Sequence, residues 1–182
     1  MTEEAECNLW KGVAMNTGTI TNSLATVFSE LIDGAPSSGG YVLNGGDDGL
    51  LRSLDQLSAA DASALTPTGS SVAAHVDHLR YGLSLMNRWS RGDNPFKDAD
   101  WAASWRKPVV SDDQWQQLRA DLRSESMSWL AALRTPRDVA ESELNGMLGS
   151  IVHLAYHLGA IRQINRAARG PKESGLSASN QP

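Results

Sequence analysis

Two of the four histidines of the chain, His153 and His157, stand four residues apart in the apolar segment SIVHLAYHLGAIRQI, residues 150–164. In an α-helix, residues i and i+4 project from the same face, so both imidazoles could bind one cation. Neutral imidazole suits zinc, nickel, copper and iron, and a divalent ion needs at least one further protein ligand. A metal site is therefore one interpretation. The other is a pair of hydrogen-bonded histidines in a helical core.

The remaining imidazoles, His75 and His78, lie in a second predicted helix, where metal sites of helical bundles usually find further ligands. On a helical wheel, His75 lies about 60° and His78 about 120° from the centre of the apolar stripe at Val72, which favours His75 as the more buried of the two. However, His78 can also face a groove between helices, because its flank holds the small or apolar residues Ala74, Gly82 and Leu85. The wheel leaves the third ligand open.

The residues between His153 and His157 are Leu154, Ala155 and Tyr156. A metalloprotease helix reads His-Glu-x-x-His, with Glu as the general base, so this segment disfavours that chemistry. The Glu-x-x-His pairs of di-iron bundles are also missing. A general acid or base would have to come from elsewhere in the chain. Asp77, Tyr81 and Tyr156 are conceivable, although a solvated position for Asp77 and a packing role for Tyr81 are the simpler interpretations.

Two further pairs of residues could shape a binding pocket. Trp101 and Trp105 could wall its mouth or serve as packing anchors, and Arg80 and Arg88 could recognise a substrate carboxylate or lie exposed on their helix. The glycine-rich segment at 35–49 is not a phosphate-binding loop, because it lacks a Lys-Ser or Lys-Thr ending and follows a helix instead of a strand.

Helical periodicity predicts four main helices that would position these residues, with polar connections between them. They cover residues 20–32, 70–92, 111–134 and 142–169, and a short helix covers 49–57. The third main helix begins with the capping box SDDQ at 111–114, and an ordered, partly helical connection precedes it. The last helix is apolar on nearly all sides between 144 and 161, as a central helix would be. No segment alternates like a strand, so we expect an all-α fold, a four-helix bundle in one domain over residues 1–170, with a disordered tail at 171–182.

The composition narrows the classes of partner. The chain has 182 residues, 41% of them hydrophobic, and a net charge of −5, so no strong positive field is present to attract nucleic acid. Its single cysteine, Cys7, cannot form an internal disulfide, which makes the cytoplasm the expected location. The sequence contains neither an export signal nor an apolar run of the roughly 18 residues that a membrane span requires. We expect no membrane partner.

Two segments together resemble the DinB-like superfamily, also called YfiT-like metal-dependent hydrolases. The stretch Ser71–Leu79 matches its Ser-Val-Ala-x-x-x-x-His-Leu pattern, with His78 in the position of the first ligand. His153 and His157, followed by Gly159 and Ile161, match its second pattern, in which Ala160 replaces the usual Gln. The resemblance extends from the connection before residue 50 through the last helix.

This resemblance implies a four-helix bundle with a divalent metal, zinc or nickel in the first place, held by His78, His153 and His157. His75 then becomes a substitute ligand or a group that orients one. The resemblance also implies an enzyme that acts on a small molecule, as a transferase dependent on a low-molecular-weight thiol or as a hydrolase. Homodimers are common among such folds. The alternative is a noncatalytic bundle in which the histidines or the metal serve stability or partner binding.

Overall fold

The computed structural model describes residues 17–168 and residue 170, so Cys7 and the predicted tail at 171–182 lie outside the described residues. All regular structure in the described part is helical, which confirms the all-α prediction. The α-helices are α1 (Thr17–Asp33), α2 (Gly49–Asp55), α3 (Ala59–Ser63), α4 (Val72–Ser90), α5 (Asp112–Arg134) and α6 (Glu141–Ile164). Three short 3-10 helices are η1 (Pro95–Asp98), η2 (Ala103–Arg106) and η3 (Arg166–Ala168).

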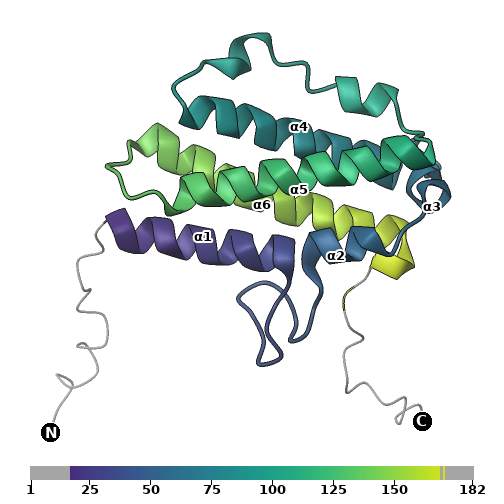
Figure 1. Cartoon of the computed structure of the whole chain (residues 1–182), viewed down its shortest axis with the longest axis horizontal. Helices are drawn as coiled ribbons and strands as arrows, with labels where there is room; N and C mark the ends of the chain where they lie inside the picture. The colour runs from purple at the N-terminus through teal and green to yellow at the C-terminus, as the bar shows by residue number, and fades with distance from the viewer. Residues whose placement is uncertain (1–16, 169, 171–182) are drawn as a thin grey trace, which may run out of the picture.

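The four long helices α1, α4, α5 and α6 run side by side along the longest dimension of the molecule (Figure 1). Helix α4 packs against α5 and α6, and α1 packs against the same two helices. The side chains between them form one hydrophobic core, whose fully buried members include Phe28, Leu122, Trp129, Leu133, Met147 and Leu154. Among the described residues, none of the helices combines the length and the apolarity that crossing a membrane would require.

Local signals set the ends of two long helices as predicted. At the start of α5, the Gln114 N–H donates to the Ser111 hydroxyl at 3.3 Å, and the Ser111 N–H donates to the Gln114 side chain at 2.9 Å. These two bonds form the expected capping box. Helix α4 ends before Gly92, which has a φ of +94° that side chains with a Cβ rarely adopt.

The sequence-based prediction is wrong at the end of the last helix, which stops at Ile164 instead of continuing to residue 169. Asn165 takes an extended conformation, and its side chain accepts a hydrogen bond from the Ala167 N–H at 2.8 Å. The chain then turns so that η3, including the fully buried Ala168, packs against α2. This contact between distant segments is absent from the local periodicity.

Two other regions also differ from the prediction. The connection 58–71 contains the short helix α3, which starts with its own capping box between Ser58 and Asp61. Helix α6 is not covered on all sides, because Leu148, Val152 and Tyr156 leave 45%, 66% and 70% of their surface exposed. These three residues recur every four positions, so they form one stripe that faces away from α1 and α4.

Candidate metal centre

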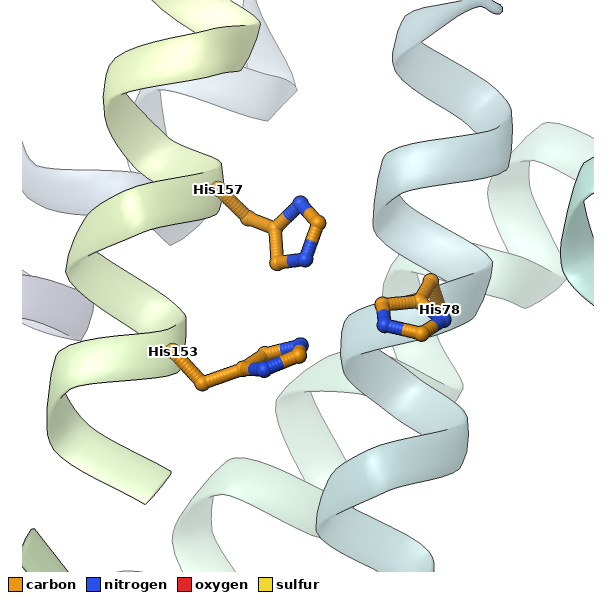
Figure 2. Close-up of side chains that lie close together, drawn as sticks. All are labelled: His78, His153 and His157. Atoms are coloured by element: carbon orange, nitrogen blue, oxygen red, sulfur yellow. The ribbon is translucent and has the colours of Figure 1, made fainter. Parts of the chain in front are cut away.

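Three of the four histidines converge between α4 and α6. His78 projects from α4 toward His153 and His157, which lie one turn apart on the facing side of α6 (Figure 2). One ring nitrogen from each residue lies within 4.8 Å of the other two, so this group could hold a metal ion. Two nitrogens bound to the same zinc ion lie at most about 4.2 Å apart. Binding would therefore need only a small inward movement of the imidazoles.

The fourth histidine, His75, contacts the same cluster from α4 but takes a different place in it. Its Nδ1 lies 2.8 Å from the Nδ1 of His157, a hydrogen bond in which one ring donates and the other accepts. His75 and His78 are almost equally buried, with 8% and 7% of their surface exposed, so burial does not distinguish them. Their contacts distinguish them, because His75 forms a hydrogen bond with the Nδ1 of His157 and leaves the Nε2 of that ring for a ligand.

Two nitrogens of the cluster are buried without a hydrogen-bond partner, His78 Nδ1 and His153 Nε2. Burying an unpaired polar atom costs free energy, and most buried polar groups in proteins find a partner. Both unpaired atoms belong to residues of the group of three that could hold an ion. A cation therefore fits the donor set present, which is three imidazoles, two of them carrying a nitrogen without a protein partner.

The environment of the cluster keeps its imidazoles neutral. Burial lowers the pKa of His157 to about 3, and repulsion from the three neighbouring histidines adds to the effect. Burial is also the main cause of the lowered pKa of His75 and His153, with a smaller contribution from His78. For His78, burial lowers the pKa against an opposing hydrogen bond to the Trp101 backbone and the charge of Asp77. Neutral imidazole is the form that binds metals.

The connection between α4 and α5, residues 91–111, covers the histidines with two tryptophans. The ring of Trp105 lies edge-on to His75, with 5.0 Å between ring centroids, and Trp101 lies 5.8 Å from His78. Two hydrogen bonds to α4 fix this connection. The Ser104 hydroxyl donates to the Asp77 carboxylate at 2.6 Å, and the Asp100 N–H donates to the Tyr81 hydroxyl at 3.0 Å. The tryptophans are thus held over the site by hydrogen bonds to α4.

These contacts limit the remaining acid-base candidates. The Asp77 carboxylate accepts hydrogen bonds from Ser104 and from Arg80, which lies 2.8 Å away, and its side chain remains 31% exposed, so Asp77 is partly solvated and at the same time paired. Arg80 is held by the same ion pair, and Arg88 is exposed beside Asp93. Within the described part of the chain, the group that could hold an ion consists of imidazoles alone.

Some residues at the site have no signal in the sequence. Phe96 and Gly149 line a cavity beside His153, although neither belongs to a motif. Two other lining residues were already singled out from the sequence, Gly82 as a small neighbour of His78 and Trp101 as a possible wall of a pocket. Comparison of the chain with protein-family models, with curated protein sequences and with solved structures gives no match.

Proposed function

We propose that this protein is a divalent-metal protein of the DinB-like type, a four-helix bundle in which His78, His153 and His157 hold the ion. The single observation that carries this proposal is the convergence of three neutral imidazoles, two of which have buried, unpartnered nitrogens. The order of the matching motifs along the chain supports the family assignment. Zinc or nickel suits three imidazole ligands.

When bound, a divalent ion supplies Lewis acidity that lowers the pKa of a coordinated water or thiol. Three protein ligands leave coordination positions for a substrate, as in catalytic and unlike closed structural sites. The chain itself contributes the arrangement of the ligands. His75 orients the His157 ring through the Nδ1 contact, and Trp101 and Trp105 exclude water from the α4 side of the cluster.

Between the two possible reactions, we propose thiol-dependent transfer ahead of hydrolysis. A thiol has a pKa of about 8.5 and loses its proton far more readily than water, whose pKa is about 15.7. A site without a carboxylate base in its ligand group therefore suits a thiol nucleophile better. In the transfer, the sulfur forms a bond to an electrophilic carbon of the second substrate, whose leaving group departs with its electron pair. The thiol proton passes to solvent.

The first experiment is metal analysis of protein purified without a polyhistidine tag, followed by zinc titration of the chelator-treated protein. We expect one ion per chain in the wild type, none in His153→Ala, and one in the control Gln163→Ala, which changes an exposed position of the same helix. Absence of bound or recoverable metal in the wild type would overturn the proposal.

The second experiment measures conjugation of several cellular thiols to a common electrophile such as 1-chloro-2,4-dinitrobenzene. We expect the wild type and Gln163→Ala to accelerate the reaction and His153→Ala to lose the acceleration. Equal rates in all three proteins would leave only the noncatalytic alternative, in which the histidines or the metal serve stability or partner binding.

A further inference from the structure

A cavity of about 240 Å³ opens beside the histidine cluster, between α4, α6 and the connection that covers them. Its walls are mainly apolar and include Leu79, Leu83 and Met86 of α4 and Leu154 of α6, with Phe96 and Trp101 on the side of the connection. No charged side chain is among the residues that line it. For comparison, an engineered apolar cavity of about 150 Å³ binds benzene. The space is therefore sufficient for a substituted benzene ring.

Glycines on α6 create this space, and one of them has no packing reason to be glycine. A Cβ on Gly146 would lie 2.5 Å from the ring of Trp89, so a side chain at this position would clash. A Cβ on Gly149 would meet no heavy atom within 4 Å, although this residue also lines the cavity. Glycine in a helix interior is destabilising relative to alanine. The missing side chain at 149 leaves the cavity open.

A buried polar atom without a partner belongs to one of the residues that line the cavity. The Ser150 hydroxyl is already satisfied, because it donates to the Met147 carbonyl at 2.7 Å and accepts from the Trp129 indole at 2.9 Å. By contrast, His153 also lines the cavity, and its buried Nε2 has no partner. Among the side chains that line the cavity, His153 and the partly exposed Trp101 indole are the two that could serve a ligand as a polar partner.

A second cavity on another face of α4 provides a contrast in charge. Its lining includes Asp77, Arg80, Arg106 and Lys107, and it contains none of the four histidines. Arg80 and Arg106 are paired there with Asp77 and Asp100, so the charges of that cavity largely balance, but its walls carry charge. By contrast, burial of a charged ligand against the uncharged walls beside His153 would be costly. The charge distribution thus separates the two cavities by the class of ligand that each suits.

We infer that the cavity beside His153 binds the uncharged, apolar part of the small-molecule ligand, a group about the size of a substituted benzene ring, and directs its polar end to the histidine cluster. This inference rests on the proposed function and names the class of substrate that the site selects. An aryl or branched alkyl thiol, or an uncharged electrophile with such a group, fits this description.

The test uses the full-length protein, with and without one equivalent of zinc, and two probes of similar size, toluene and benzoate. Methyl NMR of labelled methionines reports Met86 in the cavity wall, with the exposed Met127 of α5 as an internal control. We expect toluene to shift the Met86 signal and leave Met127 unchanged, with or without zinc. In the zinc-free protein, benzoate is expected to bind at least about ten-fold more weakly than toluene, since its charge must be desolvated. Absence of a Met86 response to toluene, or equal affinity for benzoate in the zinc-free protein, would overturn the inference.

A matched pair of glycine variants locates the probe. Gly149→Leu fills the cavity, whereas Gly159→Leu adds the same side chain to the same helix at another exposed glycine whose Cβ would also meet nothing within 4 Å. We expect Gly149→Leu to weaken toluene binding about ten-fold or more and Gly159→Leu to leave it within about two-fold. Phe96→Ala removes part of the opposite wall and should also weaken binding. Unchanged affinity in both Gly149→Leu and Phe96→Ala would contradict the assignment.

A third probe connects the cavity to the histidines. Benzyl mercaptan carries the ring of toluene and a thiol, so with zinc present it should bind at least about ten-fold more tightly than toluene. That gain should disappear in Gly149→Leu, although zinc titration of this variant should match the wild type. A wild type that binds toluene but shows no gain would separate the cavity from the site and overturn the inference. A wild type that binds no zinc would overturn the proposed function, while the toluene results would still decide whether the cavity binds apolar groups.

Discussion

Two regions of this protein bury polar side chains, but the polar atoms are paired in one region and partly unpaired in the other. In the first, which we call the loop anchor, Glu30, Asp47 and Arg162 hold the loop between α1 and α2. The Glu30 carboxylate accepts backbone N–H groups of residues 41, 42 and 43 at 2.6 to 2.8 Å. Asp47 accepts from the Gly49 N–H at 2.7 Å and from Arg162 at 2.6 Å. Each carboxylate of the loop anchor is thus paired.

The second region is the histidine cluster of His75, His78, His153 and His157. One hydrogen bond joins His75 to His157, and two other nitrogens remain buried without a partner. The pKa values of all four imidazoles are lowered, mainly by burial. The contrast teaches that burial of polar groups alone does not indicate function. Paired groups in the loop anchor stabilise the fold, whereas unpaired groups in the histidine cluster are available to a ligand.

The largest expected effect that separates the two regions is on stability. Asp47→Ala leaves Arg162 without its buried carboxylate partner and should lower the free energy of unfolding by about 3–5 kcal/mol. Its zinc affinity should be unchanged. The control is Asp48→Ala, which breaks an exposed ion pair with Arg52 and should cost about 0–1 kcal/mol. Urea denaturation measures both, and equal losses would contradict the assignment of a structural role to the loop anchor.

The reverse experiment removes a ligand. Loss of groups that merely orient a ligand typically costs 10–100-fold in metal affinity, so His157→Ala should cost more than about 100-fold. Competition with a chromophoric chelator measures this affinity. Glu30→Gln is the control from the loop anchor and should leave it unchanged. A His157→Ala protein that binds zinc like the wild type would show that the cluster is a core histidine network only.

A smaller effect distinguishes the two histidines of α4. Because His75 contacts His157 instead of joining the group of three, His75→Phe should weaken zinc binding by about 10–100-fold. His78→Phe should weaken it further. The same competition assay compares them, and a greater loss in His75→Phe would exchange the roles of the two residues.

The last comparison is the pH dependence of stability in the metal-free protein. Histidines ionise near pH 6.5 when unfolded, but burial lowers the pKa of His157 in the folded state to about 3. Below pH 6.5 the unfolded state therefore binds more protons than the folded state, so the free energy of unfolding decreases as the pH is lowered. His157→Gln should reduce this slope by about 1.4 kcal/mol per pH unit.

The loop anchor should respond at lower pH. For Glu30, burial favours the neutral form, but hydrogen bonds from Leu43, Tyr41 and Val42 together hold the pKa below its usual 4.5. Its contribution is present above pH 4.5 and is lost as the pH falls through the folded pKa. Glu30→Gln should therefore flatten the curve only below pH 4.5, whereas between pH 4.5 and 6.5 only His157→Gln should change it. In denaturation series from pH 7 to 3, an effect of Glu30→Gln between pH 4.5 and 6.5 would contradict this separation.

The sequence predicted most of the helices because their signals are local. The capping box at Ser111 and the stop at Gly92 depend on neighbouring residues, and the structure has both. The end of α6 was not predictable from such signals, because Ala168 is buried by packing against α2, more than 100 residues away in the chain. The three exposed side chains on α6 were missed for a related reason, since periodicity does not show which apolar face lacks a partner.

For the candidate site, the sequence by itself determined that His153 and His157 share a face of one helix, because the spacing of i and i+4 fixes their direction. It also excluded a carboxylate between them. Only the tertiary structure decided that His75 contacts His157 whereas His78 joins the group that could hold an ion. It also decided which nitrogens are unpaired and where the cavity lies. These features depend on the rotation and offset of α4 against α6 and on the connection that covers both. Packing across the whole core sets that geometry, and no local spacing contains it.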